Sequence, residues 1–193
     1  MWKELARYIP VALVGALEGY IRVVIRDLIN YGRPFRKNAE RLEELRVDLP
    51  TILRVQGARI SMGEFLAHLL PISSLEDINR HLSTLIGEDC FSRMKKIPFT
   101  DEHYTIEKDH PRLWAEITSI FRRRHIICHE LGGGTLIPEN LGDDHFSVLV
   151  FALTVDELMD ELMPPRPRRG RAQGMSEAPV TADEHLSDAA SQQ

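Results

Sequence analysis

The sequence has few cysteines and no long uninterrupted apolar segment. Two cysteines in 193 residues, Cys90 and Cys128, are too few for a disulfide framework and suit a reducing compartment. The most apolar segment, residues 9–31, is interrupted by four charged side chains, so we do not expect it to span a membrane. No signal-peptide pattern opens the chain. These absences predict a cytoplasmic protein that makes no contact with a membrane.

An excess of basic charge is also missing. The formal net charge is −5 and the isoelectric point is about 5.9. This balance argues against proteins that coat nucleic acid through a broad positive surface. Any contact with RNA must therefore be local.

The composition of the chain is that of one globular domain followed by a polar tail. Hydrophobic residues make up 43% and charged residues 27% of the sequence, which is ordinary for a protein with a packed core. From Pro164 onward the composition changes to proline, arginine and small polar residues, which cannot bury a core. We expect a folded domain over residues 1–163 and a disordered tail over residues 164–193.

Helical periodicity and capping patterns recur along the domain, whereas hairpin patterns are missing, so the sequence predicts an all-α bundle. Capping boxes at Ser61 and Ser73 start two of the helices, and Gly87 ends the second. Residues 148–151 are β-branched enough to form a strand, although their spacing favours a helix. The predicted helices and turns are residues 10–29, 37–46, 61–70, 74–86, 90–96 and 143–163.

The central helix is predicted from Pro111 to Leu131, because proline suits the first helical position and three glycines follow at residues 132–134. Its apolar stripe contains one charged member, Arg124. A buried charge costs several kcal/mol without a partner, about as much as a large core truncation. Arg124 therefore needs an anion, a carboxylate or a wet cleft. The apolar members of this stripe are Leu113, Ile117, Ile120, Ile127 and Leu131.

Two histidines, His125 and His129, share the flank of this stripe because they are four residues apart. Arg124 and His129 are five residues apart, which is about 140° around an ideal helix. They cannot easily converge within one straight helix. A bend near the glycines, or a second copy of the chain across a two-fold axis, would bring arginine and histidine together, so we expect a homodimer.

The run from Arg124 to His129 resembles the R-x4-H motif of the HEPN superfamily of α-helical ribonuclease domains, with the polar His125 directly after the arginine. The resemblance extends over residues 5–163, including the segments 17–20, 60–65 and 74–79. It implies a HEPN-like helical bundle and metal-independent endoribonuclease activity. Many such domains act as toxins or in phage defence, so a neutralising antitoxin protein encoded nearby is also implied.

The implied chemistry assigns roles to individual side chains. RNA supplies its own 2′-hydroxyl nucleophile, so the protein must move protons and stabilise the phosphorane charge. We assign His129 to acid–base work, Arg124 to phosphate orientation, and His125 to a supporting hydrogen bond or a second proton transfer. Glu130 and Glu18 are candidates for orienting a histidine. No metal or other cofactor is expected.

Three other interpretations compete with this one. The arginines at residues 122–124 could be a solvated helix face, which suits Arg122 and Arg123 better than Arg124. His125 and His129 have the spacing of a helical zinc pair, but the neighbouring Cys128 points about 100° away from His129 and is a poor third ligand. A HEPN fold could also act as a non-catalytic nucleotide-binding or protein-interaction module.

Overall fold

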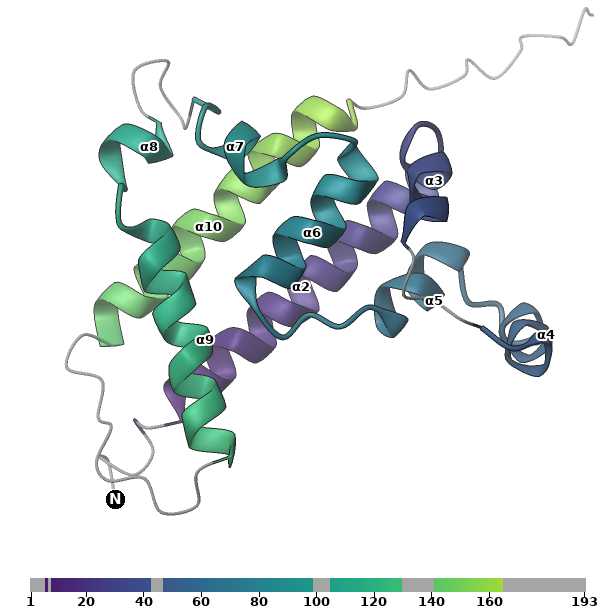
Figure 1. The fold of residues 1–193 in the computed structure, drawn as a ribbon, viewed down its shortest axis with the longest axis horizontal. Coiled ribbons are helices and arrows are strands. Elements are labelled where there is room, and N and C mark those ends of the chain that lie inside the picture. The colour runs from purple at the N-terminus through teal and green to yellow at the C-terminus, as the bar shows by residue number, and fades with distance from the viewer. Residues whose placement is uncertain (1–5, 7, 43–46, 99–104, 130–140, 165–193) are drawn as a thin grey trace, which may run out of the picture.

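The computed structural model describes residues 6, 8–42, 47–98, 105–129 and 141–164, except for the side chains of residues 52, 54–56 and 141. These residues are mostly helical, with one isolated bridge between Pro98 and Thr105. The all-α prediction is therefore confirmed. The elements in Figure 1 are α2 (Ile9–Tyr31), α3 (Phe35–Asn38), the 3-10 helix η1 (Ala39–Arg41), α4 (Leu49–Gly57), α5 (Met62–Leu69), α6 (Leu75–Ile86), α7 (Cys90–Met94), α8 (Ile106–Asp109), α9 (Leu113–His129) and α10 (Leu141–Leu162).

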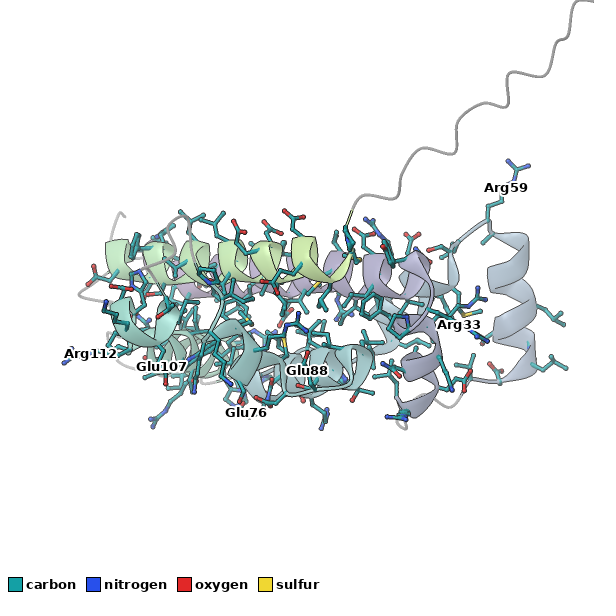
Figure 2. The ribbon with its side chains drawn as sticks, turned by 90° about the horizontal axis from the view of Figure 1, so that it is seen from above. Arg33, Arg59, Glu76, Glu88, Glu107 and Arg112 are labelled. Atoms are coloured by element: carbon teal, nitrogen blue, oxygen red, sulfur yellow. The ribbon has the colours of Figure 1, made fainter. Side chains whose placement is uncertain are left out.

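The long helices α2 and α10 lie side by side and form one layer of the bundle. Tyr20 donates a hydrogen bond from its hydroxyl to the Ala152 carbonyl at 3.0 Å, and Tyr31 donates one to the Pro164 carbonyl at 3.2 Å. From the first contact to the second, the residue number rises in both helices, so α2 and α10 run parallel. Seen from above, α6 and α7 lie on one side of this layer (Figure 2), and α9 packs across both α2 and α10.

The core forms where the apolar stripes of these helices meet. The apolar stripe of α2 repeats with the helical period of the sequence, and all six of its members are at most 5% exposed. On the other helices, Phe91 stacks on Trp114 with ring centroids 4.5 Å apart, and Phe151 meets both rings edge-on. Aromatic side chains in such geometries stabilise a core beyond the area they bury. The α2 stripe is Val14, Leu17, Ile21, Val24, Ile25 and Leu28.

Helix ends follow the predicted capping chemistry, with one shift of a single residue. Ser61 accepts a hydrogen bond from the Glu64 amide at 3.1 Å, as its capping box predicts. At α6 the cap is Ser74, which accepts from the Asp77 amide at 3.1 Å, and not the predicted Ser73. Ser73 instead donates its hydroxyl to the Asp77 carboxylate at 2.8 Å. Gly87 closes α6 in the left-handed conformation with φ of 89°, as expected.

The short helix α5 approaches α2 very closely. A β-carbon at Gly63 would overlap the Arg26 carbonyl and lie 2.7 Å from the Asn30 side-chain oxygen, so only glycine fits at this crossing. The other end of α5 is held by Arg22, which donates to the carbonyls of Ala67 at 2.5 Å and Leu70 at 3.2 Å. A cation on the last carbonyls of a helix is favourable. The α2–α5 crossing is therefore fixed at both ends.

Two predicted helices begin or end elsewhere. The central helix α9 starts at Leu113 rather than Pro111, because Pro111 lies in a turn closed by a hydrogen bond from the Leu113 amide to the His110 carbonyl at 3.0 Å. The predicted helix 37–46 is instead α3 followed by η1, ending before Leu42. Residues 43–46 lie outside the described part.

Other expectations about single elements had mixed outcomes. Residues 148–151 belong to the continuous helix α10, so the helical interpretation is confirmed and the strand alternative is wrong. His81 lies on α6 and is only 2% exposed, and its Nε2 lies 2.8 Å from the Pro71 carbonyl oxygen, so this histidine is a core residue and not the surface or helix-edge residue that a polar side chain suggests. The helix α4 was not predicted. The helix α10 ends at Leu162, and residues 165–193 lie outside the described part, so the domain boundary at residue 163 stays a prediction.

Candidate functional site

Arg124 lies on the inner side of α9 and meets a carboxylate from α2. Its Nη2 is 3.3 Å from the Glu18 Oε1, and the two side chains are 29% and 21% exposed. The sequence predicts that a charge at this position needs a partner, and Glu18 is that partner. The pair joins residues 106 positions apart, so it ties the C-terminal part of α9 to the middle of α2.

His125 and His129 lie on the exposed flank of the same helix. Their ring centroids are 4.6 Å apart and the ring planes are inclined by 46°. Both residues are exposed, as expected for side chains that must reach a substrate. The four-residue spacing therefore places two imidazoles next to each other in the last turn of α9.

Arginine and histidines occupy different sides of the helix end. Arg124 is directed to Glu18 on α2, whereas His125 and His129 are exposed on α9. Among the contacts of the described residues, none joins Arg124 to either histidine. The offset of about 140° expected from the five-residue spacing of Arg124 and His129 is consistent with this separation.

The neighbouring Arg123 holds α9 against α10. Its Nη2 is 2.5 Å from the Asp144 Oδ1, and these side chains are 20% and 9% exposed. Nearer the start of α9, Glu116 accepts a hydrogen bond at 2.6 Å from the Ser147 hydroxyl of α10. Arg123 is thus engaged in an ion pair, and the solvated-face interpretation is wrong for this residue, while Arg122 is exposed as that interpretation predicts.

Glu18 makes a different contact from those expected at sequence level. Arg22, one turn along α2 from Glu18, binds the α5 carbonyls instead of this carboxylate. Among the described contacts none joins Glu18 to a histidine, so its carboxylate serves Arg124. Glu130, the other candidate orienting residue, and the glycines at 132–134 lie outside the described residues.

A shallow groove of about 170 Å³ begins one helical turn along α2 from Glu18. Arg22 and Arg26 line it from α2, and Glu64 and His68 line it from α5. Arg26 binds the Asp27 carboxylate at 2.7 Å, and this hydrogen bond is the main cause of its raised pKa. The groove is thus lined by two arginines that both already bind other groups of the chain. This groove is not apparent from the sequence, because its two walls, α2 and α5, lie about 40 residues apart in the chain.

The two histidines supply two nitrogen donors, and a protein zinc site takes three or four protein ligands. Within the described residues, no group of three or more His, Cys, Asp or Glu side chains could hold a metal ion. Cys128 is exposed at the end of α9. None of the described helices combines the length and the apolarity that a membrane crossing requires.

Comparison of the chain with protein-family models, with curated proteins and with solved structures finds no match in any of the three. The functional argument therefore rests on the residues and the geometry of this molecule.

Proposed function

We propose that this protein is a metal-independent endoribonuclease of the HEPN type, in which Arg124, His125 and His129 act on RNA. One observation carries the proposal. The last two turns of α9 combine an arginine held in place by a half-buried carboxylate with two exposed imidazoles whose centroids are 4.6 Å apart. A guanidinium fork and neighbouring imidazoles are the groups that phosphodiester cleavage by internal attack requires.

The reaction uses the RNA's own 2′-oxygen as nucleophile. An imidazole accepts the 2′-hydroxyl proton while the oxygen attacks the adjacent phosphorus, and the bond from phosphorus to the 5′-oxygen breaks. The departing 5′-oxygen takes up a proton from a protonated imidazole. The products are a 2′,3′-cyclic phosphate and a 5′-hydroxyl. We assign the essential proton transfer to His129 and the supporting one to His125.

Arg124 stabilises the charge that builds on the phosphoryl oxygens. Its guanidinium has five donors, and the Glu18 carboxylate engages one of its two terminal nitrogens in the described contacts. The remaining donors are available to a phosphate, and Glu18 fixes the plane of the fork. Glu18 is thus a positioning residue that acts through Arg124.

Because the arginine and the histidines diverge, a complete site needs either a bend at the end of α9 or a second subunit. A homodimer in which two Arg124 and His129 sets face one cleft meets this requirement. A toxin or defence role with a neutralising protein partner encoded nearby belongs to the same proposal.

The alternative is a non-catalytic module of the same fold that binds a nucleotide or a protein. The ion pair itself favours this alternative, because an arginine already neutralised by Glu18 has less to gain from a phosphate. The two functions differ in whether any phosphodiester bond is broken.

The experiment is cleavage of a labelled RNA in excess chelator, with a matched RNA that carries one 2′-deoxyribose at the scissile position. We expect cleavage of the first RNA and resistance of the second. Activity that disappears with chelator and returns with a divalent metal would contradict the mechanism. If the protein binds both RNAs and cuts neither, the binding module is the better description.

A further inference from the structure

The outer face of the layer formed by α2 and α10 carries apolar and small side chains where a solvated surface usually carries charges. On α10, every exposed position from 146 to 153 is a large apolar residue: Phe146 at 54%, Leu149 at 54% and Leu153 at 39% exposure. Single exposed apolar residues are common, but a contiguous face shared by two helices marks an interaction site. On α2, the exposed positions from 12 to 23 are Ala12, Gly15, Ala16, Gly19 and Val23.

The two stripes lie at the same height along the layer. The contacts of Tyr20 with Ala152 and of Tyr31 with Pro164 join residues whose numbers differ by 132 and 133. Leu149 is therefore level with Ala16. A ridge of large side chains on α10 thus runs parallel to a low strip of small side chains on α2.

The low strip is open. In the described part of the chain, a β-carbon built at Gly15 or Gly19 meets no atom of another element within 4 Å. Small residues of this kind let another helix approach closely. The strip on α2 therefore has room for the large side chains of an α10 ridge. A two-fold axis parallel to both helices lays the ridge of each copy over the strip of the other at matching height.

We propose that the α2–α10 face is an interface between two copies of this chain. The outer face is large enough for such an interface. Two helices about 9 Å apart that share about 24 Å of length present roughly 500 Å² per copy. The total of about 1,000 Å² is the lower limit for a specific interface.

Charged residues border the apolar face at one end. Beyond Leu153 the next exposed positions of α10 are Asp156, Glu157 and Asp160. By the same register they are level with residues 23–28 of α2, where Arg26 already binds the Asp27 carboxylate of its own subunit. These charges therefore form the polar rim of the face.

This interface does not depend on the nuclease proposal. The helix α9 packs on α2 and α10 from the side opposite the outer face (Figure 2), so a dimer through the outer face does not use the surface that α9 covers. It is an alternative to the homodimer with a shared cleft, which needs another face, and it leaves a bend at the end of α9 as the way to complete the site. A monomeric variant that still cleaves RNA would leave both the activity and this interface standing.

The first test is Leu149→Glu in the full chain, measured by sedimentation velocity, with Leu53→Glu as a matched control. Leu53 lies on α4 and is 58% exposed, close to the 54% of Leu149. We expect the parent and the Leu53 variant to sediment as dimers and the Leu149 variant as a monomer with an unchanged circular dichroism spectrum. A parent that is monomeric at every concentration, or a Leu149 variant that stays dimeric, overturns the proposal.

A second variant keeps the proposal testable if Leu149→Glu does not fold. Gly15→Leu places a side chain in open space in the single chain but against the partner's ridge in the dimer. We expect it to fold and to sediment as a monomer, and a dimer of this variant contradicts the interface.

The geometry of the interface is tested by oxidising a mixture of Ala16→Cys and Leu149→Cys, both with Cys128→Ser. We expect a covalent dimer in the mixture and little in either variant alone. Efficient cross-linking of the Leu149 variant with itself would instead place α10 on α10 and refute the proposed axis.

Discussion

The pair formed by Arg124 and Glu18 offers a quantitative test of the site. Two unit charges about 4 Å apart attract by about 4 kcal/mol at the effective dielectric constant of a protein surface. Both side chains keep part of their exposure, 29% and 21%, and each lost hydration when the helices packed. We therefore expect a net coupling free energy of about 1 kcal/mol, at the upper end of values for exposed pairs.

The single substitutions cost more than this coupling. Arg124→Ala leaves the Glu18 carboxylate half-buried without its partner, and Glu18→Ala does the same to the guanidinium. Leaving a buried polar group unsatisfied costs about 1–3 kcal/mol. Replacing both residues removes both charges, so the double variant should be more stable than the sum of the two single losses predicts.

The assay is urea unfolding of the parent, the two single variants and the double variant. A control cycle on Arg26 and Asp27, an ion pair with side chains 39% and 46% exposed, should give a smaller coupling. A coupling of zero for Arg124 and Glu18, or one no larger than that of the control pair, would refute the account of this contact.

Two further substitutions test the packing of α2. Gly63→Ala should lower the free energy of unfolding by about 1–3 kcal/mol in urea titration, because its β-carbon overlaps the backbone of α2 at Arg26; a neutral effect would contradict the close crossing. Burial, aided by a hydrogen bond to Asp156, raises the pKa of Tyr20, so stability should fall as pH rises above about 10, where only the unfolded state ionises. Tyr20→Phe should remove this alkaline loss in thermal melts at a series of pH values, and an unchanged pH profile would show that Tyr20 is not its source.

Much of the fold follows from local sequence patterns. The stripe of α2 was predictable because its apolar residues recur with the helical period and all of them face one core. The cap at Ser61 was predictable because its partner is only three residues away. The start of α9 was not, since Pro111 suits a turn as well as the first position of a helix.

Contacts between distant residues were not predictable in the same way. Periodicity indicates that Arg124 requires a partner, but it does not identify Glu18, which is 106 positions earlier. The burial of His81 depends on the Pro71 carbonyl, which only the loop before α6 brings within reach. The helix α4 was not predicted, and its Leu49 and Leu53 are 66% and 58% exposed.

The same distinction between local patterns and contacts of distant residues applies to the candidate site. The flank shared by His125 and His129 follows from a spacing of four residues, and the structure places their rings together. The role of Glu18 required the packing of α9 on α2. The expected contribution of Glu130 remains a prediction outside the described residues.

The most direct measurement of the central proposal compares RNA cleavage by the parent, His129→Ala and Cys128→Ser. Both substituted residues, Cys128 and His129, are exposed in the last turn of α9, so each variant should fold like the parent. Losing a positioned acid–base group typically lowers the rate by about 10²–10⁴-fold. We expect such a loss for His129→Ala, a parental rate for Cys128→Ser, and 2′,3′-cyclic phosphate ends on the products. Cleavage by His129→Ala at the parental rate would contradict the assignment of this helix end as the active site.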